Sequence, residues 1–495
     1  MSRIIIQNGN MCELDLPLKF AQKLYAEFAI RHPNAFYLRT RQRGMQNWDG
    51  KIHYINKHGE FKIGLLPAVY EKCTEYGIKP KVVDMRQPLP KVSKVVTKIG
   101  EYKLRPEQEK AVKAVINNTI GGKPFHIGVL DYTVNAGKTL IMSSLYLSYK
   151  KQLKTLLITN DSDWLNQARE EFKQYLPGED ITFVQGKVLN WSNFTIGMVQ
   201  SISRNMRFYQ KELSQIDMVL IDEADQGGSR QYQNVITRLF NTRIRIGLSG
   251  TIYMSKLAKD KVKNMNLECF FGKVLAEFKL RDSIKKGYST KTVVKMVPGK
   301  PWYGNWESDC ISYKEIYDDS ITNSYTAWLM AYSRLRWNIN QGRYPALVVC
   351  KHIAHCENLY KFFKKKLGDA YNIAYVHVNT KSKLRQQIMK DFRDGKIDIL
   401  VSTTIIARGK NFPKLRYLLN AASMDSQEKS IQFLGRLVRT DKSKKKVYLD
   451  DLHYPGNYLD RHGKHRKQYY QRQELKVILL DKLWKKHPNH SLIQS

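Results

Sequence analysis

Residues 125–140 read FHIGVLDYTVNAGKTL, and this stretch decides the fold of the chain. The apolar run at 125–130 predicts a buried strand, the segment 133–137 predicts a short turn, and Lys138 opens a helix. A helix that begins directly after a strand and a tight turn presents unpaired backbone N–H groups and a positive dipole end to an anion. The stretch therefore predicts a loop that binds the phosphates of a nucleotide.

Three residues of this loop have a chemical reason to be there. Gly137 lets the backbone approach an anion closely, Lys138 is expected to reach the outer phosphates, and Thr139 is expected to offer its hydroxyl to Mg²⁺. The full phosphate-loop pattern would place its first glycine at 132, where this chain has Tyr132. Taken alone, the tetrapeptide AGKT also fits an ordinary helix start with a solvated lysine.

A second motif favours the nucleotide interpretation. Residues 217–225 read DMVLIDEAD, an apolar run that ends in carboxylates, and the carboxyl ends of strands are where open α/β sheets bind ligands. Asp222 is predicted to hold Mg²⁺, directly or through water. Glu223 is predicted to orient and deprotonate the attacking water. A capped turn with solvated acids is the alternative, and Lys138 upstream argues against it.

The charge of the chain indicates a polyanionic partner. Lys and Arg number 83 against 45 Asp and Glu, which gives a net charge of +38. Such an imbalance favours nucleic acid, with a basic surface kept for solubility as the alternative. No run approaches 18 uncharged apolar residues, so no membrane span is expected. The N-terminus does not resemble a signal peptide and the cysteines are scattered, which favours reduced thiols and a cytoplasmic setting.

Residues 1–88 carry no nucleotide motif and predict a small α+β domain. Amphipathic or apolar patterns predict one helix over 16–31 and a second over 67–75. The segment between them predicts a hairpin that can grip phosphates with arginines and stack bases on rings, although a solvated basic face is the alternative. The side chains proposed for DNA contact alternate along this hairpin or lie just across its turn: Tyr37, Arg39, Arg41, Arg43 and Trp48.

Beyond a proline-containing linker at 84–100, strands and helices alternate, which predicts parallel sheets covered by helices on both faces. The alternation pauses between about 280 and 340 and then resumes. The fold class is therefore α/β, with a small α+β N-terminal domain and a helical C-terminal tail. The predicted domains are 1–88 for DNA binding, 89–285 with the phosphate loop, 286–455 with an arginine motif, and a basic helical extension at 456–495.

The arginine motif is QFLGRLVR at 432–439. If the helix spans 429–439, Gln432, Arg436 and Arg439 share one face, and Gly435 permits close approach. Two arginines on that face can meet a triphosphate bound by the first α/β domain and stabilise charge on the transferring phosphoryl group. An amphipathic helix with solvated arginines is the alternative.

In order and spacing, these motifs resemble those of the superfamily 2 helicases and translocases, over roughly residues 100–440. The resemblance implies two tandem RecA-like domains that use ATP and Mg²⁺ to move along DNA. The matching positions are Arg105 and Gln108, 135–139, 159–167, Gln200 and Ser201, 222–225, 249–251, 403–409 and 432–439.

The resemblance also implies roles for individual residues. Gln108 is expected to read adenine. Ser249 and Thr251 are expected to couple the state of the nucleotide to domain closure. The remaining implied contacts are to the nucleotide, from Arg105, Asn135, Ala136, Gly137, Lys138, Thr139 and Gly409, and to DNA, from Gln200, Ser201 and Thr403, with Gly409 and its neighbours also near DNA phosphates.

More narrowly, the segment NWDGK at 47–51, with Gly64 and Leu65 downstream, resembles the accessory domain of the phage UvsW-type branch-migration helicases. This implies single-stranded, forked or four-way DNA as substrate, in recombination, repair or replication, with other proteins of those processes as possible partners. The setting is then the cytoplasm of a bacterial host.

Two departures from the family pattern stand out. Tyr132 replaces a glycine, and Ser249-Gly250-Thr251 replaces the commoner Ser-Ala-Thr. The literal Asp-Glu-Ala-Asp is typical of RNA-specific relatives, but Gln432 stands where those proteins have His-Arg, which favours DNA. An RNA helicase, a translocase that remodels protein–DNA complexes without unwinding, and a nucleic-acid-binding protein with a vestigial ATPase are the alternatives.

Overall fold

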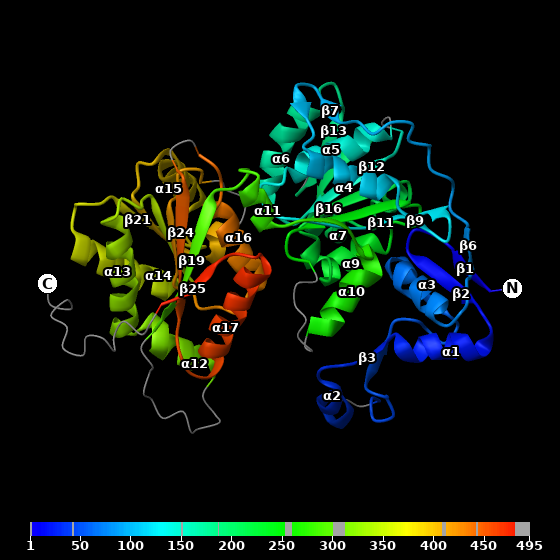
Figure 1. Cartoon of the computed structure of the whole chain (residues 1–495), viewed down its shortest axis with the longest axis horizontal. Coiled ribbons are helices and arrows are strands. Elements are labelled where there is room, and N and C mark those ends of the chain that lie inside the picture. The colour runs from blue at the N-terminus through cyan, green and yellow to red at the C-terminus, as the bar shows by residue number, and fades with distance from the viewer. Residues whose placement is uncertain are drawn as a thin grey trace. The chain divides into compact units, whose positions relative to one another are not determined.

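The structure is a computed structural model that describes residues 2–41, 44–149, 152–186, 188–252, 260–299, 312–407, 412–441 and 444–480. The chain divides into two compact units, Met1–Phe278 and Lys279–Ser495, and each contains a large sheet (Figure 1). The predicted α/β class is confirmed. In the part of the chain that is described, no helix combines the length and the apolar character needed to cross a bilayer.

The first unit is built on an eight-stranded sheet in the order β14-β13-β15-β12-β16-β17-β11-β18. Only β14 pairs antiparallel, and the other neighbours are parallel. The central strands are buried at every position because both faces of a parallel sheet are covered. Their bounds are β11 His126–Tyr132, β12 Thr155–Thr159, β13 Ile181–Gln185, β14 Val188–Leu189, β15 Phe194–Met198, β16 Met218–Asp222, β17 Ile244–Ser249 and β18 Val274–Phe278.

Helices cover the two faces of this sheet (Figure 1). One face carries α4 (Pro106–Ile116), α5 (Lys138–Ser148) and α6 (Ser162–Tyr175), and the other carries α7 (Val199–Arg204), α9 (Arg230–Ile236) and α10 (Lys261–Phe271). The predicted strand, turn and helix around the phosphate loop are confirmed as β11 and α5. Asp161 caps α6, because its Oδ1 accepts a hydrogen bond from the Trp164 backbone N–H over 3.1 Å.

The N-terminal α+β module packs directly on this unit. Its four-stranded sheet has the order β5-β2-β1-β6, and residues from Ile4 to Phe271 form one continuous apolar core. Arg245 of β17 is fully buried and donates hydrogen bonds to Gly9 O and Asn10 Oδ1, both over 2.7 Å. The bounds are β1 Arg3–Ile6, β2 Met11–Asp15, α1 Leu18–Glu27, β5 Glu60–Lys62, α3 Leu66–Glu75 and β6 Lys81–Asp84.

The hairpin predicted after α1 is wrong. Residues 35–41 form helix α2 (Ala35–Arg41), and only the short strands β3 (Ala29–Arg31) and β4 (Lys51–His53) pair antiparallel. Arg41 lies one helical turn from Tyr37, with its guanidinium 5.2 Å from the ring centroid, so these side chains do not alternate along a strand. The polar alternation lacked apolar residues for an opposite, buried face, and Ala, Leu and Arg favour a helix. Arg43 lies outside the described residues.

The second unit contains a seven-stranded, fully parallel sheet in the order β21-β22-β20-β23-β24-β19-β25. The strand β25 corrects the expected all-helical tail, because its β-branched residues add to the sheet edge beside β19. The elements are β19 Lys291–Pro298, α13 Tyr325–Ile339, β20 Ala346–Cys350, α14 Ile353–Leu367, β21 Ile373–Val376, α15 Ser382–Asp394, β22 Ile399–Thr403, β23 Tyr417–Asn420, α16 Gln427–Leu437, β24 Lys446–His453, α17 Asn457–Arg472 and β25 Val477–Leu479.

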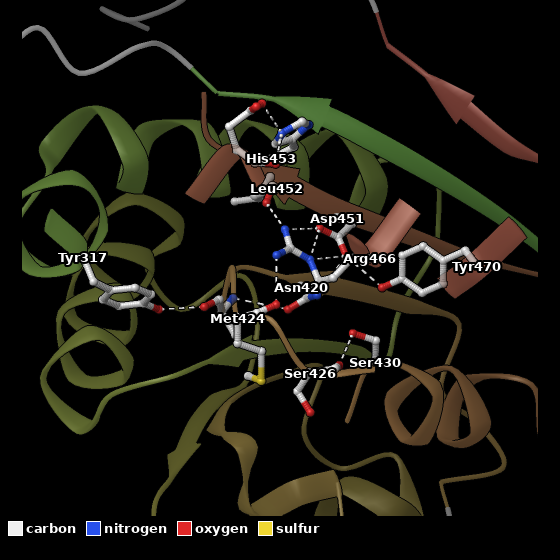
Figure 2. Close-up of polar contacts among 12 residues, drawn as sticks. Tyr317, Asn420, Met424, Ser426, Ser430, Asp451, Leu452, His453, Arg466 and Tyr470 are labelled. Atoms are coloured by element: carbon white, nitrogen blue, oxygen red, sulfur yellow. Dashed lines mark hydrogen bonds and ion pairs between the residues drawn. The ribbon is translucent and has the colours of Figure 1, made fainter. Parts of the chain in front are cut away.

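A buried ion pair fixes α17 to the second sheet (Figure 2). Arg466 of α17 and Asp451 of β24 are both fully buried, and Arg466 Nη2 donates to Asp451 Oδ1 over 2.8 Å. Tyr470 and Asn420 donate to the other carboxylate oxygen over 2.7 and 2.9 Å. Arg466 Nη1 donates to Met424 O over 3.0 Å, in the segment that leads to α16. The predicted C-terminal helix is therefore an integral part of the second unit.

Candidate active site

The phosphate loop makes its tight turn at 135–137. Asn135 and Gly137 both have left-handed backbone conformations, with φ of 64° and 70°, and Gly137 is the residue that caps α5. Glycine adopts this conformation without the steric cost of a Cβ. Tyr132, at the position of the missing glycine, is buried and donates its hydroxyl proton to Glu107 O over 2.7 Å. The loop thus begins with the buried ring of Tyr132. The backbone that can approach an anion closely comes later in the loop, at 135–137.

The first turn of α4 holds the phosphate loop in place. Gln108 is buried, and its Nε2 donates to Ala136 O over 2.8 Å while its Oε1 accepts from the Arg105 backbone N–H over 2.8 Å. Arg105 Nη1 donates to Asn135 O over 3.3 Å. A Cβ at Gly137 would lie 2.3 Å from Gln108 Nε2. The structure therefore brings together the residues predicted at 105, 108 and 135–137, while adenine recognition by Gln108 stays a prediction.

Lys138 and Asp222 face each other across the carboxyl ends of β11 and β16. Lys138 Nζ lies 3.8 Å from Asp222 Oδ1, and Asp222 is buried. Burial raises the pKa of Asp222, and the Lys138 charge opposes that rise. Among the described residues, Asp222 Oδ1 has no hydrogen-bond donor. A buried carboxylate oxygen without a donor, beside a lysine and a helix N-terminus, fits Mg²⁺ and the phosphates that such an ion accompanies. Thr139 is half-buried in the first turn of α5.

Glu223 follows Asp222 in a left-handed conformation, with φ of 53° and ψ of 47°. Its Oε2 accepts a hydrogen bond from Gln226 Nε2 over 3.1 Å, and Gln226 Oε1 accepts from Asn160 Nδ2. Gln200 Nε2 donates to Asn160 O over 3.3 Å. We call this series of hydrogen bonds the Gln226 bridge. It connects Glu223, the predicted base, to Gln200, which is predicted to contact DNA. Asn160 lies in the predicted segment 159–167, but Gln226 and its contact with Asn160 were not predicted, because only the sheet order brings β12 and β16 together.

Ser249 and Thr251 lie at the end of β17, beside the acidic motif. Ser249 Oγ donates to Asp225 Oδ1 over 2.6 Å, and the Thr251 backbone N–H donates to Ser249 Oγ over 3.1 Å. A Cβ at Gly250 would lie 3.0 Å from Thr133 Cα and 3.1 Å from Tyr132 O. The glycine that replaces the commoner alanine is therefore explained by its packing against the backbone of the phosphate loop.

The other residues predicted to contact nucleic acid or nucleotide lie in varied surroundings, and two of them have hydrogen-bond partners nearby. Ser201 Oγ accepts from the Gly186 backbone N–H over 2.9 Å, and Trp48 Nε1 donates to Lys51 O over 2.9 Å. Arg39 and Arg41 are exposed on α2. Thr403 is buried at the end of β22 in the second unit. Gly409 lies outside the described residues.

The arginine motif lies only partly on a helix. Gln432 and Arg436 belong to α16, which begins at a Ser426 cap whose hydroxyl accepts from the Lys429 backbone N–H over 3.3 Å. Arg439 lies beyond the end of α16, which corrects the predicted common helical face. The chain leaves the helix there because Thr290 bonds the carbonyls of Val438 and Arg439, over 2.8 and 3.1 Å.

Two relatives of the chain bear the name helicase. The chain is similar to a Sulfolobus islandicus filamentous virus protein that bears the name helicase 22, at 23% identity over 72% of this chain and 65% of the relative. It is also similar to the ATP-dependent RNA helicase CHR1 of Candida albicans, at 23% identity over 46% of this chain and 33% of the relative. The chain thus spans about one third to just under two thirds of the length of these relatives.

At least one solved structure has a related fold. The DNA-bound Type ISP restriction-modification enzyme LlaBIII matches 83% of this chain and 34% of its own, with a TM-score of 0.56 and 13% identity. The crystal structure of T4 UvsW matches 97% of this chain and 100% of its own, with a TM-score of 0.44 and 18% identity.

Two family models match the chain in succession. Residues 101–254 match the Type III restriction enzyme, res subunit, and residues 331–441 match the helicase conserved C-terminal domain. Together they span more than half of the 495 residues. The first match contains the phosphate loop and the acidic motif, and the second contains the arginine motif. The chain therefore belongs to the superfamily 2 helicases.

Proposed function

We propose that this protein is an ATP-dependent DNA helicase or translocase that acts on branched DNA, as in fork regression or branch migration during recombination, repair or replication. The observation that carries the ATPase assignment is Lys138 Nζ, 3.8 Å from a buried Asp222 oxygen, at the N-terminus of α5. The net charge of +38 supports a nucleic acid as the second ligand.

Hydrolysis uses residues of the first unit. Lys138 neutralises the outer phosphates, and the backbone at 135–137 approaches them closely. Bound Mg²⁺, held by Thr139 and Asp222, supplies charge neutralisation on the phosphate oxygens. Glu223 takes a proton from the attacking water, and Gln226 orients that carboxylate through the 3.1 Å hydrogen bond. Arg436 and Arg439 of the second unit are proposed to stabilise charge that develops on the phosphoryl group.

Movement along DNA requires that the nucleotide state change the affinity for DNA. Two connections in the first unit support such coupling. Ser249 bonds Asp225 of the acidic motif, and Gly250 packs against the phosphate loop. The Gln226 bridge runs from Glu223 to Gln200. A change at the phosphates thereby reaches segments proposed to hold a strand.

Branched DNA is favoured because the N-terminal module offers a second grip. Its helix α2 presents exposed Arg39 and Arg41, and the module shares a core with the sheet that carries the phosphate loop. DNA is favoured over RNA by Gln432, as argued from the sequence. RNA is the second candidate, because a relative of this chain is named an ATP-dependent RNA helicase.

The test measures ATP hydrolysis by the full chain with single-stranded, duplex, forked and four-way DNA and with RNA, together with strand displacement on the fork. We expect the largest stimulation by forked or four-way DNA. Lys138→Ala is the matched control and should lose hydrolysis under every condition while it still binds DNA. Stimulation by RNA alone would overturn the DNA assignment, and hydrolysis without displacement would favour a remodelling translocase.

A further inference from the structure

A cavity of about 470 Å³ lies in the N-terminal module, between α2 and the β3–β4 ribbon. Figure 1 shows α2 and β3 at the margin of the first unit, away from its eight-stranded sheet. Arg31, Phe36, Arg39, Asp49 and Lys51 are among the residues that line it. The cavity is separate from the phosphate loop, and Arg31, Phe36 and Lys51 have no role in the site described above.

Three cations and one carboxylate line this cavity. Arg31 and Lys51 are direct cross-strand neighbours in the β3–β4 pair, and Arg39 reaches the same cavity from α2. Like charges directly opposite each other destabilise a pair of strands. Within the described ranges, none of the three forms an ion pair. The ribbon therefore keeps an unfavourable charge arrangement that a bound anion would relieve.

Asp49, the carboxylate in the lining, is already engaged. Its Oδ1 accepts from the Lys51 backbone N–H over 2.9 Å, and its Oδ2 lies 2.7 Å from His53 Nε2. These hydrogen bonds lower the pKa of Asp49 and keep it ionised as part of the turn. The charge of Lys51 also lowers the pKa of Asp49, and with one carboxylate against three cations the cavity lining keeps a net positive charge.

An exposed aromatic ring stands beside the cations. Phe36 is 80% exposed although it lines the cavity, and Tyr37 next to it is 56% exposed. Exposed rings beside cations are the arrangement on which proteins stack unpaired bases while they hold the strand's phosphates. A volume near 470 Å³ is typical of sites for small ligands, about 300–1,000 Å³, and suits one nucleotide better than a stacked base pair.

We propose that this cavity binds one unpaired nucleotide of a nucleic acid strand, with its phosphate between Arg31, Arg39 and Lys51 and its base on Phe36. The proposal rests on the proposed function, since it takes nucleic acid as the substrate. The proposed site would bind the unpaired nucleotide at the point where the duplex arms of a branch separate. The two large sheets and their motifs do not supply such a site in the proposed function. Phosphate contact comes from the cations, and discrimination of a branch from a plain duplex comes from the ring.

The test compares two variants of the full chain on a forked DNA that carries 2-aminopurine at the branch and on a plain duplex of equal length. Phe36→Ala should weaken fork binding at least tenfold, abolish the change in 2-aminopurine fluorescence, and leave duplex binding within twofold. Phe208→Ala is the matched control, because Phe208 is also 80% exposed in the same unit. An equal loss on fork and duplex, or no loss on the fork, would overturn the proposal.

Lys51→Gln separates binding from folding. Removing one of two opposed cations should keep or raise the melting temperature, while fork affinity falls and the log–log salt slope becomes shallower by about 0.7–0.9. Lys57→Gln, at an exposed lysine of the same module, should change neither. A lower melting temperature with unchanged fork affinity would mean that Lys51 is structural. If the unaltered protein shows no stimulation of ATP hydrolysis by any nucleic acid, the proposed function fails, whatever the cavity variants do.

Discussion

Ser249 donates a hydrogen bond to Asp225 over 2.6 Å and thereby ties the end of β17 to the acidic motif that follows β16. Both residues are buried, and the next residue, Gly250, packs on the phosphate loop. A change in the position of the phosphates thus has a short, direct route to the neighbouring strand. This contact gives the coupling role expected of Ser249 a specific partner.

Ser249→Ala should lower strand displacement more than ATP hydrolysis, because Asp225 loses the donor that connects it to β17. The measurement is the number of base pairs displaced per ATP hydrolysed. Ser214→Ala is a suitable control, since that hydroxyl donates to the carbonyl of nearby Lys211, over 2.8 Å. Equal losses of displacement and hydrolysis would indicate a purely structural contact.

Glu223→Gln should bind ATP normally but hydrolyse it at least about 10²-fold more slowly, because an amide cannot accept the proton from water. Nucleotide binding and single-turnover hydrolysis are measured on the same preparation. Gln226→Leu should lower kcat by a smaller factor with little change in KM, since it removes the hydrogen bond that orients Glu223. Near-normal hydrolysis by Glu223→Gln would show that another group is the base.

Arg436→Ala and Arg439→Ala should each lower kcat far more than the affinity for nucleotide. An arginine that stabilises the transferring phosphoryl group is worth a factor of about 10³ or more in rate. Lys445→Ala, at an exposed cation of the same unit, is the control. Unchanged turnover in both arginine variants would mean that neither side chain contacts the phosphates.

Arg466→Met should destabilise the second unit by about 3–5 kcal/mol, because it leaves the buried Asp451 carboxylate without its cation. The double variant Arg466→Met/Asp451→Leu should lose less than the single variant. Urea unfolding of both is compared with Lys464→Met, which breaks an exposed pair with Asp460 and should cost no more than about 1 kcal/mol. A double variant that loses as much stability as Arg466→Met, or more, would contradict this account.

Acid should destabilise the second unit in part through His355. Burial lowers the pKa of His355 from 6.5 to about 3. The unfolded chain therefore binds a proton that the folded chain rejects, and the free energy of unfolding decreases as the pH falls from about 6.5 towards 3. His355→Met should flatten this dependence in chemical unfolding across that range, and His58→Met, at an exposed histidine, should not. Identical slopes in the protein and its His355→Met variant would show that His355 is not the titrating group.

The sequence predicted those parts of the site that are continuous in the chain. The apolar run before the phosphate loop and the run that ends at Asp222 are read directly as β11 and β16, because buried parallel strands need nearly every residue to be apolar. Gln226 was missed because its contact with Asn160 depends on β12 and β16 being neighbours.

Predictions of secondary structure from residue periodicity were wrong where the repeating residues were polar. The alternating arginines and tyrosine at 37–43 suggested a strand, but with few apolar residues to bury on the other face, the segment up to Arg41 forms α2. In the same way, the helical spacing of Gln432, Arg436 and Arg439 could not show that α16 would end at Leu437. Thr290, far away in the sequence, donates to the carbonyl of Arg439 beyond that end.

The buried Arg245 has a mechanical consequence. A protein that moves a nucleic acid strand must transmit force between the surface that binds the strand and the domains that hydrolyse ATP. Arg245 in β17 donates to Gly9 and Asn10, so a buried hydrogen-bonded cation joins the N-terminal module to the sheet, next to the strand that ends at Asp222. Under the proposed function, tension applied to the module would pass into the sheet at this point. In the proposed motor the module and the sheet would move as one piece, and removing the module would deprive the Arg245 guanidinium of two of its three hydrogen-bond acceptors.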